Sequence, residues 1–423
     1  MKKINPTSQY LSWIAYAVLL TIAPLVFYKG ASISVLSQMG IMIIFALSYN
    51  MLLGQGGMLS FGHAVYAGLG AFFAIHAMNL ATDHVITLPV SLIPLVGGLA
   101  GMLFGILFGY VTTKKSGTTF AMITLGICEL VHSSSLMFPE FFGGEGGITT
   151  NRVIGPAFHG ITFGPQIQVY YLIAAWLLFC TLAMYACTKT PLGKIMNAVR
   201  DNPERAEFIG YNTQWVRYLT LIISAFFAGI AGALSAINYE IVSAENVSLT
   251  LSANVLLFTF IGGSGYFFGP VIGAVIGVLL TTVLSGYTQA WQLYLGIFFI
   301  LSVMALPGGV ASSLMQNLQL IRYKQFVTVW RVQIILIVFA LLALVGFAGL
   351  TEMLYHRNFE SDSGTVMKLF SIELDIASYW PWSVAGLTLL IGLTGIQLLK
   401  PALHARRISA ASAIEAASKK EVA

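Results

Sequence analysis

The fold of this chain is decided by residues 188–214, which read TKTPLGKIMNAVRDNPERAEFIGYNTQ and interrupt a largely apolar sequence. The apolar residues of the first half keep a helical period of i, i+3, i+4 and i+7, at Leu192, Ile195, Met196 and Val199. Pro203 disfavours the helical conformation at Asn202, so a first short helix should end there. Asn202 can then cap a second helix that begins at Pro203, and Gly210 can end it.

Two short amphipathic helices between apolar segments, rich in both signs of charge, are typical of a docking surface for another protein. An ordinary solvated loop is the alternative interpretation. The residues expected to carry the contact are Ile195, Val199, Arg200, Asp201, Pro203, Glu204 and Gly210.

Composition identifies a membrane protein. The chain has 423 residues, of which 57% are hydrophobic and 9% are charged, whereas roughly a quarter of a soluble domain is charged. The net charge of +5 arises from basic residues in short loops and does not indicate nucleic-acid binding. Cys128, Cys180 and Cys187 lie in apolar stretches without disulfide or metal spacing, so we expect buried thiols, no metal site and no cofactor.

A membrane span needs about 20 mostly apolar residues. Candidate segments run over residues 11–28, 34–53, 64–80, 88–111, 118–137, 168–187, 215–238, 251–264, 270–286, 289–306, 331–350 and 380–399. The sequence therefore predicts an all-α polytopic membrane protein with about ten core transmembrane segments plus two C-terminal ones.

The loop charges predict the topology. With the N-terminus in the cytoplasm, Lys114, Lys115 and the 188–214 corner fall inside, while Glu140, Glu145 and the acidic 352–375 segment fall outside, as the positive-inside rule requires. The C-terminus is then also cytoplasmic. We expect three parts: a transmembrane domain over 1–309, an extension with two further spans over 310–400, and a polar cytoplasmic tail over 401–423.

Two glycine-rich breaks, at residues 54–63 and 262–270, interrupt the predicted spans. Irregular backbone at membrane depth is tolerated only inside protein or beside water, and it commonly marks a substrate path. The polar residues of the first break are Gln55, Ser60 and His63, and we expect Ser60 and Phe61 to line a route. Tight turns at the membrane surface are the alternative.

Small residues recur every four positions at Gly97, Gly101, Gly105 and Gly109, a pattern that favours tight static packing over sliding surfaces. Glu129 and His132 are three apart on one helix face, where they could form a structural pair or a proton relay. Residues 143–148, GGEGGI, form a glycine-rich outer loop that is either a gate, a partner contact or a plain linker.

Four segments resemble, in order, motifs of the high-affinity branched-chain amino acid ABC permeases of the LivM type: residues 46–64, 116–125, 143–148 and 192–233. The resemblance covers approximately residues 36–309. It implies a type II-like ABC importer permease bundle in the bacterial inner membrane. The C-terminal pair of spans lies beyond the usual end of such permeases, and we expect it to pack at the periphery.

The resemblance also implies partners: a second, LivH-like permease subunit, two ATPase subunits that dock on residues 188–214, and a periplasmic substrate-binding protein. The chain has no Gly-x-x-x-x-Gly-Lys-Ser/Thr loop, so we expect a transport subunit that is not itself an enzyme. Gly144, Glu145 and Gly146 are expected at an outer gate or binding-protein contact. Residues expected on the translocation path are Gln55, Ser60, Phe61, His63, Thr119 and Glu129.

Other classes stay open at this point. Urea or short amides are alternative substrates, because related permeases carry them. A self-sufficient secondary transporter or channel would need coupling residues at mid-membrane, and the sequence offers little beyond Glu129. A membrane enzyme would need a cluster of catalytic residues, which the sequence does not display. Neighbouring genes for ATPases and a binding protein would distinguish these classes.

Overall fold

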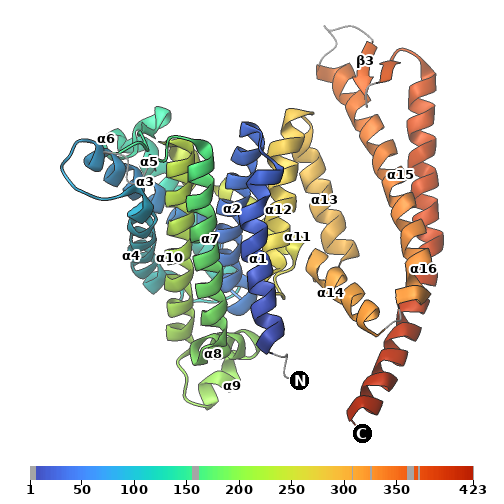
Figure 1. Ribbon diagram of the computed structural model, residues 1–423, viewed down its shortest axis with the longest axis horizontal. Helices are drawn as coiled ribbons and strands as arrows, with labels where there is room; N and C mark the ends of the chain where they lie inside the picture. The colour runs from blue at the N-terminus through green and yellow to red at the C-terminus, as the bar shows by residue number, and fades with distance from the viewer. Residues whose placement is uncertain are drawn as a thin grey trace. The chain divides into compact units, whose positions relative to one another are not determined.

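The computed structural model describes residues 6–154, 162–306, 308–323, 326–359, 366–369 and 372–422 (Figure 1). Its α-helices are α1 (Pro6–Val26), α2 (Gly30–Asn50), α3 (His63–Thr82), α4 (Ile93–Thr112), α5 (Thr118–Met137), α6 (Pro139–Phe142), α7 (Gln166–Lys189), α8 (Pro191–Asp201), α9 (Pro203–Phe208), α10 (Thr213–Tyr239), α11 (Leu249–Gly262), α12 (Gly269–Val278), α13 (Trp291–Ala305), α14 (Gly309–Arg322), α15 (Phe326–Phe359) and α16 (Tyr379–Val422). Residues 360–365, expected in the acidic outer loop, lie outside the described part.

Short elements complete the chain. Two π-helical turns are η1 (Met51–Gln55) and η5 (Leu279–Val283), and 3-10 turns are η2 (Val90–Leu92), η3 (Gly144–Gly146), η4 (Ala244–Val247) and η6 (Leu284–Gly286). Four short strands form two antiparallel pairs: β1 (Ile148–Thr149) with β2 (Ile241–Val242), and β3 (Val366–Leu369) with β4 (Ile372–Asp375).

The prediction of an all-α membrane protein is confirmed. In the described ranges, nine helices are long and apolar enough to cross a membrane, and the bent pair Trp291–Met304 and Gly309–Ile321 is a tenth candidate. Leu11–Val26 and Leu249–Gly262 are shorter apolar helices. Every segment predicted from the sequence falls on one of these helices.

The chain forms two compact units. The first unit comprises Met1–Val283 and Phe298–Ala311, and the second comprises Leu284–Ile297 and Ser312–Ala423. The second unit therefore includes the beginning of α13 together with the C-terminal helices.

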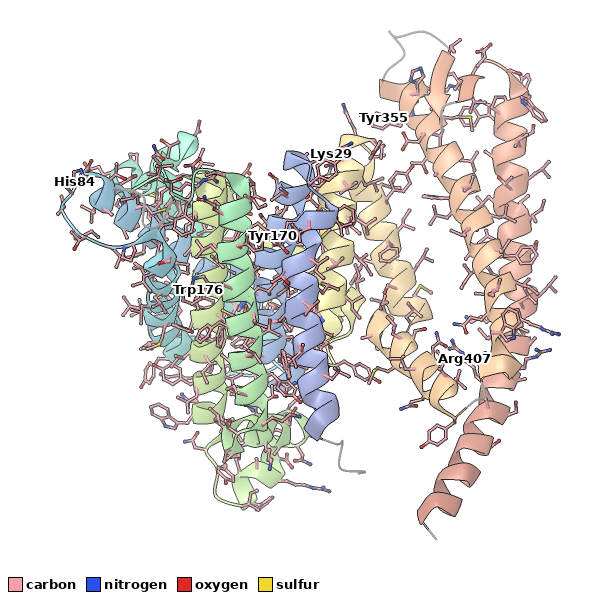
Figure 2. The ribbon with its side chains drawn as sticks, in the orientation of Figure 1. Lys29, His84, Tyr170, Trp176, Tyr355 and Arg407 are labelled. Atoms are coloured by element: carbon pink, nitrogen blue, oxygen red, sulfur yellow. The ribbon has the colours of Figure 1, made fainter. Side chains whose placement is uncertain are left out.

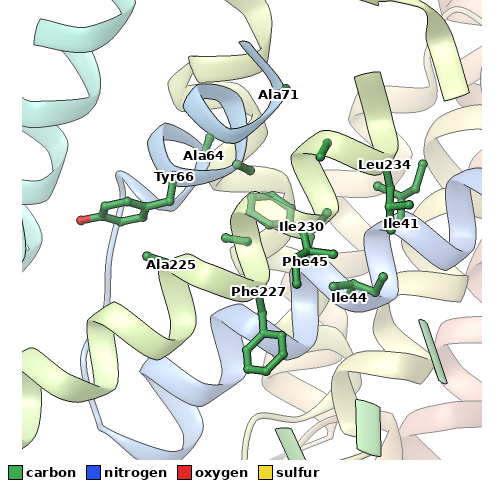
Figure 3. Close-up of a cluster of buried hydrophobic side chains, with 14 of the residues drawn as sticks. Ile41, Ile44, Phe45, Ala64, Tyr66, Ala71, Ala225, Phe227, Ile230 and Leu234 are labelled. Atoms are coloured by element: carbon green, nitrogen blue, oxygen red, sulfur yellow. The ribbon is translucent and has the colours of Figure 1, made fainter. Parts of the chain in front are cut away.

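The core of the first unit surrounds α10, which packs against α2, α3 and α4. Figure 3 shows Ile41 and Phe45 from α2 beside Ile230 and Leu234 from α10, and all four side chains are buried. Helix α1 is bound at the edge of this core, because the Tyr170 hydroxyl of α7 donates to the Leu20 carbonyl over 2.7 Å (Figure 2).

Glycines allow α3, α4 and α10 to approach each other closely. A Cβ atom at Gly232 of α10 would collide with the Ala67 carbonyl of α3, and one at Gly101 of α4 would collide with the Ala225 carbonyl of α10. Association of helices in lipid depends on such close packing, because no water is released between apolar surfaces. The contacts lie inside one unit, which agrees with the predicted tight packing.

The second unit is held by its own contacts. Helices α15 and α16 pack along each other, with Gly346 of α15 against the backbone of α16 and Gly392 of α16 against Ala343. The beginning of α13 joins them, because Tyr294 Oη donates to Glu352 Oε1 over 2.8 Å. Tyr355, labelled in Figure 2, adds a 2.7 Å hydrogen bond to Gln289 Oε1.

Candidate coupling and translocation site

The predicted corner at residues 188–214 is confirmed in its backbone. Thr190 accepts a hydrogen bond from the Gly193 amide and caps α8. Asn202 leaves the helical region with φ −156° and ψ 98°, and its Oδ1 atom accepts from the Arg205 amide over 3.0 Å to cap α9. Gly210 follows with φ +91°, a conformation that glycine adopts without strain. Figure 1 places α8 and α9 at one end of the first unit, beyond α7 and α10.

The apolar face of α8 is directed into the chain itself. Met196 and Val199 are buried with Ala206 of α9 and Val216 of α10, and Ile195 packs against the same cluster. The sequence predicts that Ile195 and Val199 contact a partner protein. Helical periodicity predicts such a face but not which surface covers it, and here α10 does so.

A different apolar surface is exposed on the corner. The side chains of Phe208 and Ile209 are 89% and 70% exposed, and Tyr211 beside them is 43% exposed. Phe208 is the last residue of α9 and Ile209 caps it, so both lie outside the i, i+4 pattern of α8 and its periodicity does not reveal them. The only signal in the sequence was an apolar pair, Phe208-Ile209, within a charged segment.

The same corner also carries exposed charged residues. Arg200 and Asp201 form an exposed ion pair with an Nη2–Oδ1 distance of 2.8 Å, and Glu204 is exposed at the start of α9. Glu207 is fixed to α10, because Thr213 Oγ1 donates to Glu207 Oε1 over 2.7 Å. The corner is therefore held to α10 by a hydrogen bond and by apolar packing, and its exposed surface contains both charged and apolar side chains.

Helix α8 is bonded to the first glycine-rich break. The Arg200 guanidinium donates to the Gly54 carbonyl, and Asn197 Nδ2 donates to Gln55 Oε1 over 2.9 Å. Gly57 has φ +66°, and a Cβ atom there would lie 2.6 Å from Arg200 Cγ. Gln55, expected on the path, is thus held by the corner.

The two glycine-rich breaks also touch each other. A Cβ atom at Gly54 would collide with the Ser264 carbonyl of the second break, and Gly263, with φ +105°, lies against Gly309. The first break begins within the π-helical turn Met51–Gln55, and such turns are frequent at functional sites. We call the contiguous set formed by α8, the two breaks and Gly309 the glycine layer.

Ser60 and His63 lie inside the protein. His63 Nε2 is 2.9 Å from Ser48 Oγ, and the His63 ring stacks on Phe45 with 5.3 Å between centroids. Tyr49 Oη donates to the Ser60 carbonyl over 2.9 Å. Both side chains are fully buried, so in this conformation they fix the break to α2.

Phe61 differs from these neighbours, because it is half-buried and its amide donates to Thr124 Oγ1 of α5 over 3.2 Å. Helix α5 presents Thr119 and Glu129 on its exposed side, together with Gly126 and Ser133. Of the residues expected on the path, Ser60 and His63 are therefore buried, Gln55 and Phe61 are partly buried, and Thr119 and Glu129 are exposed on α5.

Glu129 and His132 do not form an ion pair in the described part of the chain. His132 Nδ1 instead lies 3.2 Å from the Ala244 carbonyl in η4. Cys128, buried on the adjacent face, donates to the Val247 carbonyl over 3.4 Å. One face of helix α5 is thus hydrogen-bonded to η4, and the Glu129 side chain is exposed on another face.

The glycine-rich outer loop is bound to the end of α10. Gly143, Gly144 and Gly147 all have positive φ, and the following Ile148 pairs with Val242. Glu145, between these glycines, is exposed. The Arg152 amide, further along, donates to Glu240 Oε1 over 2.9 Å. The loop is a defined turn that presents Glu145.

Many apolar helices surround one packed core, and the corner at residues 188–214 is hydrogen-bonded to the first glycine-rich break. This arrangement is typical of a multi-pass membrane protein of the transport-permease class. Residues 32–306 match the family described as "Branched-chain amino acid transport system / permease component". The chain belongs to this family and is a permease component of ABC-type transport.

Individual relatives agree with this membership. The chain is 27% identical to the high-affinity branched-chain amino acid transport system permease protein LivM of Escherichia coli, over 72% of this chain and 76% of that protein. It is 24% identical to the galactose/methyl galactoside import permease protein MglC of Salmonella typhimurium, over 69% and 93%. It is 28% identical to the galactofuranose transporter permease protein YtfT of Escherichia coli, over 61% and 74%. No solved structure matches.

Proposed function

We propose that this chain is the permease subunit of an ABC importer for branched-chain amino acids. It forms the translocation path with a second permease subunit and is driven by two separate ATPase subunits, while a periplasmic binding protein delivers the substrate. The similarity to LivM over about three quarters of both chains supports the substrate class. MglC and YtfT are named for sugars, so hexoses are the second candidate substrate class.

The glycine layer is the observation that carries the coupling part of this proposal. Asn197 and Arg200 bind the two residues that end the π-helical turn of α2, and that turn touches the second break. A displacement of α8 would therefore pull on α2 directly and on α11 and α12 through backbone contacts. Packed layers of this kind have discrete arrangements, so nucleotide binding by a partner can bias an inward or an outward state.

We propose that the ATPase contacts Phe208 and Ile209, with the charged residues around them orienting the partner. Apolar burial would supply most of the affinity, since exposed ion pairs contribute only about 0–1 kcal/mol each. Ile195 and Val199 would then act by anchoring the corner to α10, while Pro203 and Gly210 fix its shape.

The exposed face of α5 is proposed to meet the second permease subunit across the path. A carboxylate at the centre of a lipid-facing helix costs about 2.5–3.5 kcal/mol, and Glu129 lies in the middle of α5. Water or a partner subunit on this face would remove that cost. Thr119 and Ser133 on the same face would add polar lining.

Cytoplasmic termini are part of the proposal, because the basic turn at Lys114 and the corner share one end of the bundle. Helix α4 ends at this turn and α10 begins at the end of the corner, and the two helices are linked by the 3.1 Å hydrogen bond from Tyr218 Oη to the Ile106 carbonyl. Glu145 would then face the periplasm and the binding protein. Impermeant labelling of single cysteines at 145 and 205 from the same side would contradict this orientation.

The decisive experiment is uptake by the complete system in cells that lack other importers. Leucine, galactose and urea are supplied separately, with and without an inactivated ATPase. Leucine uptake that requires the ATPase is the expected result. Galactose as the better substrate would select the sugar alternative, and leucine uptake without the ATPase would indicate a secondary transporter.

Phe208→Asp tests the coupling surface in the same cells. We expect the ATPase to be lost on purification and uptake to fall to background, because the variant places a charge in an apolar contact. Phe208→Leu is the matched control and should retain both. A fully active Phe208→Asp complex would show that the ATPase binds elsewhere.

A further inference from the structure

A cavity of about 190 Å³ lies in the first unit. It is a partly open pocket bordered by α2, α3 and α10 together with η4 and the first turn of α11. Tyr239, the last residue of α10, lines it, whereas the first turn of α10 adjoins the corner. The cavity therefore lies toward the end of the bundle opposite α8.

The lining of the cavity has an apolar part and a polar part. Ile41, Met42 and Leu251 supply an aliphatic wall, with Phe45 beside them. Gln38, Ser235, Tyr239 and Asn246 supply polar groups, none of which carries a formal charge.

Two amide groups in the lining have their acceptor atoms occupied. Asn246 Oδ1 accepts from the Ser243 amide over 2.9 Å, and Gln38 Oε1 accepts from Thr282 Oγ1 over 2.8 Å. Since each side-chain amide has one acceptor oxygen and one NH2 donor group, both residues retain donors. Donors of this kind suit a carboxylate, which accepts several hydrogen bonds.

The volume of the cavity indicates the size of ligand that fits between the helices. A protein cavity of roughly 150 Å³ holds benzene, so one of 190 Å³ has room for about eight non-hydrogen atoms. Valine has about eight and leucine about nine, whereas a hexose has about twelve and urea about four. Urea would also leave the aliphatic wall without a contact. The size and the lining both favour a small aliphatic amino acid.

We propose that this cavity is a holding site for a branched-chain amino acid on its way through the permease, with the carboxylate at Asn246 and Gln38 and the side chain against Ile41 and Leu251. The site rests on the proposed import function and assigns its substrate specificity to this subunit. The absence of a charged partner in the lining keeps the binding weak, as a site on a transport route requires.

Asn246→Asp in the complete transport complex is the test. The variant keeps an oxygen acceptor for the Ser243 amide but replaces the NH2 donors by a second carboxylate oxygen. The KM for leucine should rise roughly tenfold or more, because a charge-assisted hydrogen bond is lost and a like charge faces the substrate. Inhibition of uptake by leucinamide, which has no carboxylate, should improve relative to inhibition by leucine. A purely structural defect would not produce that reversal.

Asn151→Asp is the matched control. Asn151 Oδ1 also accepts from a backbone amide, that of Val153, but Asn151 is exposed outside the cavity. This variant should have wild-type kinetics. Ser235→Phe provides a second test by filling the cavity, and it should abolish saturable binding of radiolabelled leucine to the purified complex without the binding protein.

The outcomes separate the two proposals. Wild-type leucine import with unchanged kinetics in both Asn246→Asp and Ser235→Phe would overturn the holding site and leave the import function intact. A wild-type complex that imports no branched-chain amino acid would overturn the import function, and the holding site with it. If the Asn246→Asp complex does not assemble, the binding of radiolabelled leucine to the Ser235→Phe complex decides whether the cavity is the holding site: loss of binding supports the site, and unchanged binding overturns it.

Discussion

Helices α3 and α10 of the first unit contrast with α15 and α16 of the second. Of their membrane-length windows, 78% of the residues are buried in each of the first two, against 11% and 17% in the last two. Helix α15 is nevertheless at least as apolar as α10. Hydropathy therefore shows which segments cross the membrane but not which of them form the core.

Side-chain size distinguishes the two regions. The buried surface of α10 includes Ala228, Gly229 and Gly232, which permit backbone contact. The exposed positions of α15 are large, among them Ile334, Val338, Leu341 and Val345. Small residues mark surfaces that face protein, because close packing is what holds helices together in lipid.

The largest effect on assembly and uptake is expected from a larger side chain introduced into the core of the first unit. Gly232→Val would drive a branched side chain into the Ala67 carbonyl, so α10 must move away from α3. Overpacking typically costs about 1–3 kcal/mol, and more where backbone is hit. We expect loss of the assembled complex on size-exclusion chromatography and loss of uptake.

Gly386→Val in α16 is the control for that substitution. No atom lies within 4 Å of a Cβ built at Gly386, so the same change meets open space. It should assemble and transport normally. If both variants lost assembly and uptake to the same extent, small residues would not distinguish the packed core of the first unit from the helices of the second.

A smaller effect is expected from removal of the extension. Truncation after Gly309 deletes α14, α15 and α16 but keeps the glycine layer, including the contact between Gly263 and Gly309. Substantial uptake should remain, while the melting temperature should fall because Gln289 and Tyr294 lose their partners. Complete loss of transport by a truncated protein that inserts and assembles would make the extension part of the mechanism.

The sequence predicted local features well and long-range contacts poorly. The spans and the capped corner at Asn202 follow from neighbouring residues alone, and both were predicted. The hydrogen bond from Arg200 to Gly54 joins residues that are 146 positions apart, so no periodicity can reveal it. The burial of Val199 was missed for the same reason, since the covering residue, Val216, lies on the next long helix.

The smallest effect is expected where the extension meets α13. Glu352→Gln keeps an acceptor for the Tyr294 hydroxyl but removes its charge, and a hydrogen bond to a charged group contributes about 1.5–3 kcal/mol against about 0.5–1.5 for a neutral one. The second unit should lose about 1 kcal/mol of stability, measured as a small decrease in melting temperature, with uptake unchanged. Tyr294→Phe removes the donor and leaves the Glu352 carboxylate without it, so its decrease should be larger. If Glu352→Gln lowered uptake while the melting temperature stayed constant, the carboxylate would have a role in transport, and the extension could not be regarded as peripheral.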